Sequence, residues 1–362
     1  MSSARVRPVP PNWFAAVMGT SIVATAAHAL PVRLPGLEAV AWLAWAAAGA
    51  ILVAVVAATA VHLATDRDAL RGYLLDPQVA PFYGATAMGL LAFGTATLVV
   101  ATPLLGDAAV ATAGALWVTG TALGLATAVG IPVLAFTRHS VAADAASGAW
   151  LMPVVPPMVS AAGGALLLPY LDGGAAQALA YACILMAGAA GVATLALLPQ
   201  IWSRLAHHGR GAAVAVPTLW MVLGPLGQGA TAAGLLADHA GPALGVDRGV
   251  LTVVAVAVGL PLMGFALLWL AIAGSVTATT AREGLPFSLA FWAFTFPVGT
   301  LVTGASSLAT HTGAAALAAL AVGMFALLLG GWAVAATGTV RDMRARRVRG
   351  LDVPNRPAMA GS

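Results

Sequence analysis

The stretch from Phe287 to Ala309, FSLAFWAFTFPVGTLVTGASSLA, decides which fold we expect for this chain. It carries no charged residue. Its length is sufficient to cross a bilayer, because about 20 residues in a helix span the hydrocarbon core. The stretch therefore predicts a transmembrane helix near the end of the chain.

The two faces of this predicted helix differ. At 100° per residue the rings of Phe287, Phe291 and Phe294 share one face, and Phe296 falls on the other. A hydroxyl stripe accompanies Phe296, formed by Thr300, Thr303 and Ser307. A ring on a polar stripe is what a plug in a narrow aqueous path would look like, but from helical phase alone packing against a neighbouring helix is the favoured interpretation. The sequence pattern leaves both interpretations open.

Composition places the whole chain in a membrane. Of the 362 residues 60% are hydrophobic and 8% are charged, with a mean hydropathy of +0.94. A soluble domain cannot bury so much apolar surface, so we expect a polytopic membrane protein. All 16 basic residues are arginines. A single cysteine, Cys183, excludes an intrachain disulfide and a cysteine-based metal site.

Ten apolar segments follow one another, and every formal charge lies in a connection or a tail. We expect one transmembrane domain over residues 1–362. The start of the chain imitates a signal peptide, with Arg5, Arg7 and an Ala27-His28-Ala29 motif, but its apolar run is long and we expect it to stay as the first helix. The expected segments are Trp13–Leu30, Ala39–Ala64, Phe82–Leu104, Ala109–Phe136, Trp150–Tyr170, Ala176–Ile201, Val214–Leu236, Val250–Ser275, Phe287–Ala309 and Ala314–Val340.

The arginines predict the orientation. Fourteen lie in the tails and in the connections after even-numbered segments, against two, Arg33 and Arg248, in the other connections. Loops rich in arginine stay in the cytoplasm. We therefore expect a multi-pass protein of the cell membrane with a cytoplasmic N-terminal tail (1–12) and a cytoplasmic, arginine-rich C-terminal tail (341–362).

An internal repeat predicts the arrangement of the helices. The odd-numbered segments begin near residues 13, 82, 150, 214 and 287, which are 64 to 73 residues apart. Each unit is one helical hairpin, and five parallel hairpins favour a ring around a quasi-five-fold axis, with one helix of each hairpin inside. The expected fold is thus all-α, with ten transmembrane helices around a central pore.

Polar residues gather on the odd-numbered segments. Polar side chains are costly against lipid, so an aligned set is expected to face a pore or a neighbouring helix. Prolines at 157, 225 and 297 are expected to kink these helices, and broken backbone at membrane depth is tolerated where it lines a cavity. The pore-lining candidates are Ser21, Thr25, Thr86, Ser160, Gly224, Gln228, Thr300 and Thr303, and the kink candidates are Pro157, Pro225 and Pro297.

The spans lack the residues that several other functions need. They contain no carboxylate and no metal-binding histidine motif, and His207-His208 lies in a connection between arginines. We therefore expect neither an enzyme, nor a cofactor, nor a metal site, nor a nucleic-acid partner. A neutral pore with hydroxyl donors and arginines at its mouth favours small inorganic or organic anions.

Five stretches together resemble the tellurite-resistance/dicarboxylate transporter family. This family includes bacterial TehA-type channels, fungal malate and sulfite permeases and plant slow-type anion channels. The matching stretches lie on all five odd-numbered segments: PPNWFAAVMGTSIVATAA (Pro10–Ala27), PFYGATAMGL (Pro81–Leu90), WLMPVVPPMVSAAGGALLLPYL (Trp150–Leu171), PTLWMVLGPLGQGATAAGLL (Pro217–Leu236) and FSLAFWAFTFPVGTLVTGA (Phe287–Ala305).

The resemblance implies ten helices around a quasi-five-fold pore, a homotrimer, and a phenylalanine of the ninth helix that occludes the pore. The helical phase selects Phe296 as this gate. We expect an anion channel or uniporter. The alternatives are a proton-coupled carrier for C4-dicarboxylates such as malate, an exporter of sulfite or tellurite, or a membrane scaffold that transports nothing.

Overall fold

The computed structural model describes residues 9–142 and 144–349, and this part of the chain is helical throughout, with no strand. Three of the arginines behind the predicted orientation, Arg5, Arg7 and Arg356, lie outside the described residues, as do most of the two predicted tails.

Five helices lie inside the molecule and come from the odd-numbered apolar segments. In the apolar windows of the spans that contain the last two of them, 83% and 89% of the residues are buried. The inner helices are α1 (Phe14–Ala29), α4 (Tyr83–Ala96), α7 (Pro156–Leu167), α9 (Leu223–His239) and α12 (Phe296–Thr312).

Five longer helices surround them. Only 17–28% of their apolar windows is buried within the chain, so their remaining apolar faces are suited to contact lipid. Side chains such as Leu43, Phe136 and Leu185 point outward. The outer helices are α2 (Leu37–Thr65), α6 (Asp107–Thr137), α8 (Gly173–His208), α11 (Arg248–Gly284) and α13 (Ala315–Arg349).

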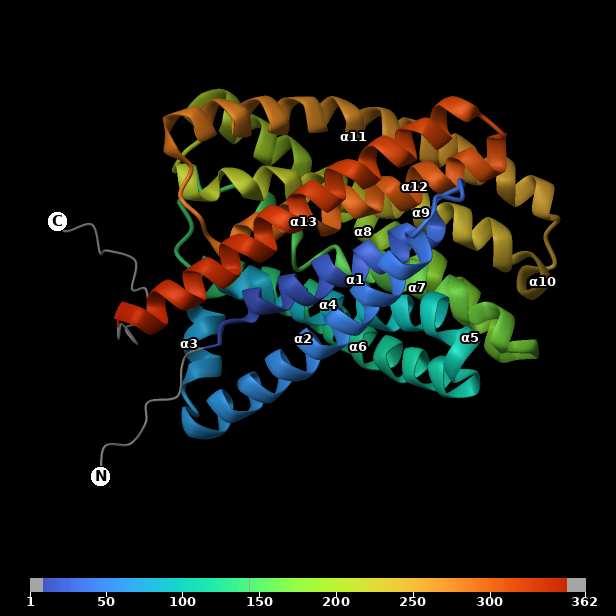
Figure 1. Ribbon diagram of the computed structural model, residues 1–362, viewed down its shortest axis with the longest axis horizontal. Helices are drawn as coiled ribbons and strands as arrows, with labels where there is room; N and C mark the ends of the chain where they lie inside the picture. The colour runs from blue at the N-terminus through green and yellow to red at the C-terminus, as the bar shows by residue number, and fades with distance from the viewer. Residues whose placement is uncertain (1–8, 143, 350–362) are drawn as a thin grey trace.

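The inner helices close a ring. Each one contacts the next along the chain, from α1 through α4, α7 and α9 to α12, and α12 contacts α1. Each inner helix also packs against the outer helix that follows it, so the chain forms five successive hairpins. Figure 1 shows the long α13 running across the inner helices and α11 along the upper edge of the molecule.

Every inner segment begins with a short 3-10 helix before its α-helix starts. The tighter 3-10 turns change the helical phase, because they have about 3.0 residues per turn instead of 3.6. These leading segments are η1 (Pro11–Trp13), η2 (Ala80–Phe82), η4 (Gly148–Leu151), η6 (Ala213–Val222) and η7 (Leu289–Phe294).

The three candidate kink prolines lie at the start of α-helices. Pro157 and Pro297 occupy the first turns of α7 and α12, and Pro225 is the third residue of α9. Proline is tolerated there because the first N–H groups have no partner within the helix. The backbone interruption therefore precedes each proline, as a change of helix type, and does not bend a continuous α-helix.

Within the described residues eight helices are long and apolar enough to cross a membrane. The sequence predicts ten such segments. The difference lies at α1, which has 16 residues, and at α7, which has 12. Length of the α-helix alone does not set these two apart, because α4 has only 14 residues and is counted within a longer span, Ala80–Leu105, that includes its neighbouring short helices.

Short helices in the connections lie toward the two ends of the molecule. Figure 1 shows α3 (Ala69–Leu75) and the end of α13 toward one end of the long axis. The helices α5 (Thr102–Leu105) and α10 (Gly241–Leu244) lie toward the opposite end. Two further short elements follow inner helices: the π-helical η3 (Thr97–Ala101) follows α4, and η5 (Leu168–Tyr170) follows α7.

Candidate ion pathway

Phe296 is the first residue of α12 and lies between two cavities. Its side chain is 3% exposed and lines both a small cavity and a larger one. The backbone breaks just before it, at Thr295, where φ is −106° and ψ is −80°. Because of this break, the side-chain directions in α12 do not continue those in η7. The direction of the Phe296 side chain is therefore set by the first turn of α12.

The other phenylalanines of the stretch form a separate aromatic cluster. The ring of Phe291 lies 5.0 Å from that of Phe287 and 5.2 Å from that of Phe294, measured between centroids. Phe294 also meets the indole of Trp220 at 5.0 Å. These rings pack with one another, whereas Phe296 faces the cavities.

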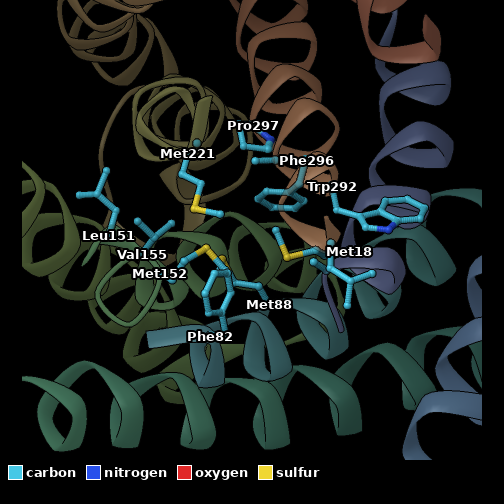
Figure 2. Close-up of a pocket in the computed structure, with 14 residues that line it drawn as sticks. Met18, Phe82, Met88, Leu151, Met152, Val155, Met221, Trp292, Phe296 and Pro297 are labelled. Carbon is cyan, nitrogen blue, oxygen red and sulfur yellow. The ribbon is translucent and has the colours of Figure 1, made fainter. Parts of the chain in front are cut away.

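The small cavity lies on the side of Phe296 where the inner helices begin. Its volume is about 30 Å³. All five inner segments contribute to its wall, and Figure 2 shows long apolar side chains converging on it. Four methionines and Phe296 supply one such side chain from each segment: Met18, Met88, Met152, Met221 and Phe296.

This small cavity offers water no hydrogen-bond partner from a free side-chain group. The one polar side-chain atom among the lining residues is the indole N–H of Trp292, which donates to the Thr339 hydroxyl at 3.1 Å. A water held inside a protein needs two to four polar partners. The side chains that line this cavity are therefore apolar, and an apolar constriction of this kind is suited to exclude ions.

The larger cavity lies on the other side of Phe296, along the second halves of the inner helices. Its volume is about 260 Å³. Its wall is mixed, with apolar residues such as Ile22 and Val159 between polar ones. The polar lining residues are Thr25, His28, Thr95, Gln228, Thr231, Asp238, Thr303, Ser306, Ser307 and Thr310.

The carboxylate of Asp238 has two hydrogen-bond partners. It accepts hydrogen bonds from Arg248 at 2.6 Å and from the His311 ring at 3.1 Å. His311 is also within 3.4 Å of the Ser307 hydroxyl through its other ring nitrogen. The sequence places Asp238 and His311 merely at two helix ends 73 residues apart, and no spacing in the sequence joins them. Only the Ser307–His311 pair, four residues apart on one helix, carries a local signal.

The eight pore-lining candidates separate into groups. Thr25, Gln228 and Thr303 line the larger cavity and Gly224 lines the small one. Ser21 is buried and Thr86 is half-buried, and neither lines either cavity.

Two further candidates, Ser160 and Thr300, lie at contacts between helices. The Ser160 hydroxyl accepts from Thr121 of α6 at 3.0 Å. The Thr300 hydroxyl donates to the Pro297 carbonyl at 2.6 Å, and its backbone lies against α9. Hydroxyls committed in this way serve packing, as is common between membrane helices.

Arginines gather at the end of the molecule where the inner helices begin. Arg67, Arg71 and Arg138 line a surface cavity of about 470 Å³ beside α3. Arg210, in the connection after α8, pairs with Glu283 and donates to Thr280 at 2.6 Å, both at the end of α11. The connections that follow the outer helices carry these arginines, and they thus lie on the same side of the molecule as the small cavity.

Comparison with known proteins decides the family. The family model described as SLAC1, voltage-dependent anion channel, matches residues 8–340. The chain belongs to the SLAC1 family. This match spans all five hairpins of the fold, and it confirms the resemblance to the tellurite-resistance/dicarboxylate transporters drawn from the five inner segments.

Individual SLAC1-family relatives agree with a transport role. A sulfite efflux pump of Arthroderma otae and another of Trichophyton rubrum are each 27% identical over 306 residues, which cover 82% of this chain and 81% of each relative. An uncharacterized transporter of Methanocaldococcus jannaschii is 24% identical over 335 residues, with 92% and 94% covered. This SLAC1-family chain is a multi-pass membrane protein of an anion-transport family.

Proposed function

We propose that the chain is a transmembrane anion channel or uniporter whose closed pathway is blocked by Phe296. One observation carries the proposal: the Phe296 ring forms part of the wall of both cavities, so it lies between a dry constriction and a polar chamber. All five inner segments surround each cavity, as expected for a single path along the axis of the ring.

The proposed architecture is a single transmembrane domain of ten membrane-crossing segments around a quasi-five-fold axis, assembled as a homotrimer in the cell membrane. The closed ring of five hairpins supports the first part, because α1 and α7 take equivalent places in it although their α-helices are short. We place both termini in the cytoplasm. The dry constriction then faces the cytoplasm and the polar chamber faces outward.

Sulfite is the first anion to test, because the fungal relatives are named as sulfite efflux pumps. Purified protein in proteoliposomes should carry labelled sulfite, chloride and malate at different rates, and a pH gradient should leave these rates unchanged. Malate flux that requires a proton gradient would instead indicate a proton-coupled dicarboxylate carrier. The same assay with tellurite tests the remaining exporter alternative.

The gate has its own test. Phe296→Ala should raise anion flux at least about tenfold, because removing the ring joins the two cavities and lets water connect them. Phe291→Ala changes the same residue type in the aromatic cluster and is the matched control, so its flux per folded protein should stay at the parent level. Folded Phe296→Ala protein with parental flux would overturn the gate.

A further inference from the structure

The surface cavity beside α3 has a wall that combines arginines with leucines. Its volume is about 470 Å³. Arg67 comes from the connection between α2 and α3, Arg71 from α3 itself and Arg138 from the end of α6. The leucines of the wall are Leu70, Leu74, Leu75 and Leu134. One cavity therefore offers both positive charge and apolar surface to a ligand.

The three arginines of this cavity are not paired with carboxylates. Within the described part of the chain, their side chains take part in no ion pair and no hydrogen bond. The acidic residues of the same connection lie outside the wall: Asp66 accepts from the Asp68 backbone N–H at 3.1 Å, and Asp76 accepts from that of Gln78 at 2.8 Å. Three guanidinium groups around one cavity without a counter-charge favour an anionic ligand.

Hydrogen bonds from both neighbouring helices hold α3 in place. The Tyr73 hydroxyl meets the ring of His62 on α2 at 3.1 Å, and His62 is buried. The ring of His139, just after α6, donates to the Leu74 carbonyl at 2.9 Å. The wall of the cavity is thus formed before a ligand arrives, which lowers the entropy cost of binding.

The cavity lies at the depth of the lipid headgroups. The helices α2 and α6 have 29 and 31 residues, so each is about 45 Å long, against about 30 Å for the hydrocarbon core of a bilayer. Arg67 and Arg138 come directly after these helices, where they leave the hydrocarbon. Leu70 and Leu75 are 42% and 45% exposed, and Phe136 on the outer face of α6 is 85% exposed. Acyl chains would cover this apolar surface, whereas a free anion in water would not.

We propose that this cavity binds an anionic phospholipid, with the phosphate on the three arginines and the acyl chains against the leucines and the outer face of α6. The planar guanidinium group matches a phosphate through two parallel hydrogen bonds. A zwitterionic headgroup brings its own cation among the arginines and is therefore bound less well. The inference goes beyond the proposed function and does not depend on which ion the pathway carries.

The experiment measures the melting temperature of the purified protein in detergent while short-chain phosphatidylglycerol is added. The lipid should raise the melting temperature of the parent until the site is saturated, because a ligand of the folded state stabilises that state. Arg71→Gln and Arg138→Gln should each raise the half-saturating lipid concentration about tenfold, as expected for loss of a charged hydrogen bond. Arg282→Gln removes an exposed arginine at the end of α11, outside this cavity, and is the matched control. It should change that concentration at most about twofold.

Two further probes separate the phospholipid from its parts. Short-chain phosphatidylcholine keeps the acyl chains and has a zwitterionic headgroup, and glycerol phosphate has no acyl chain, so both should raise the melting temperature much less. An equal rise with phosphatidylcholine would overturn the role of the arginines, and an equal rise with glycerol phosphate would indicate a site for free phosphate and overturn the lipid.

The variants provide two more ways to overturn the site. Equal shifts for Arg71→Gln and Arg282→Gln would mean that the lipid responds only to the general surface charge. A changed oligomeric state of Arg71→Gln in size-exclusion chromatography would identify the cavity as a contact between copies of the chain. Either result would overturn the phospholipid site, and neither measurement involves ion flux.

Discussion

Met88 and Phe296 face the same small cavity from different helices, although no pattern in the sequence pairs them. Methionine is unbranched and flexible, so it fills an irregular gap and can also move aside. The methionines therefore suit a seal that must close a path and later open it. At the residue scale, the proposed closure depends on the absence of polar partners as much as on the size of one ring.

We expect Met88→Ser to increase basal anion flux several-fold, because a hydroxyl gives water a partner inside the dry cavity. Met88→Leu keeps the cavity apolar and should leave flux at the parent level. Met186→Ser changes a buried methionine of outer helix α8 and is the control for general loosening. Proteoliposome flux measures all three, and equal leaks from Met88→Ser and Met186→Ser would contradict the seal.

Phe291 and Phe296 should also differ in their contribution to stability. Phe291 is surrounded by rings, so Phe291→Ala leaves a cavity and should lower the free energy of unfolding by about 3–5 kcal/mol. Phe296 borders empty space on both sides, and Phe296→Ala should cost less than half as much. Thermal unfolding of the two purified variants in detergent measures the difference, and equal destabilisation would mean that Phe296 is ordinary core.

At the scale of elements, α9 and α12 approach each other closely through small residues. A methyl group on Gly227 would lie 2.5 Å from the Thr300 carbonyl carbon, and one on Gly304 would lie 2.9 Å from the Gly227 oxygen. Small residues let membrane helices approach in this way. This contact holds Gln228 beside the α12 hydroxyls, so the packing of two helices sets the geometry of the chamber.

Gly227→Ala should therefore lower the free energy of unfolding by about 1–3 kcal/mol through overpacking. Gly264→Ala, on outer helix α11, is the matched control, because a methyl group there meets nothing within 4 Å. It should be neutral or slightly stabilising, since alanine restricts the unfolded chain. Denaturation followed by circular dichroism compares the two variants, and an unaffected Gly227→Ala would argue against tight packing at this contact.

At the scale of the whole molecule, the arginines and the two ends of the fold point to one orientation. Arg67, Arg71 and Arg138 lie together at the end where the inner helices begin. We expect the C-terminus to be cytoplasmic, so a reporter enzyme that works only in the cytoplasm should be active when it is fused after Ser362. A second fusion, placed in the connection between α9 and α11, should report the opposite side. If the Ser362 fusion reports the side outside the cytoplasm, the predicted orientation is wrong and each cavity faces the opposite side of the membrane.

The sequence by itself determined the membrane class, the five-fold repeat of hairpins, the inner position of the odd-numbered segments and the family. The membrane class and the repeat follow from composition and periodicity, which are local properties of the chain. The family followed from the resemblance of five stretches to known members. It also singled out Phe296, Gln228, Thr25 and Thr303, all of which line a cavity in the structure.

Only the tertiary structure decided which polar residues face the chamber and which serve packing. Ser160 belongs to the polar stripe of the fifth segment, and Thr300 to the same stripe as Thr303. In the structure the Ser160 hydroxyl accepts from Thr121 of α6, and the Thr300 hydroxyl donates to the Pro297 carbonyl of its own helix. The leading 3-10 turns shift the helical phase from which a stripe is derived. The hydrogen-bond partner of a hydroxyl can also lie far along the chain, as for Thr231 and Thr303, which are 72 residues apart. The methionine seal and the pairing of Asp238 with His311 arise for the same reason: they depend on which helices become neighbours in the ring.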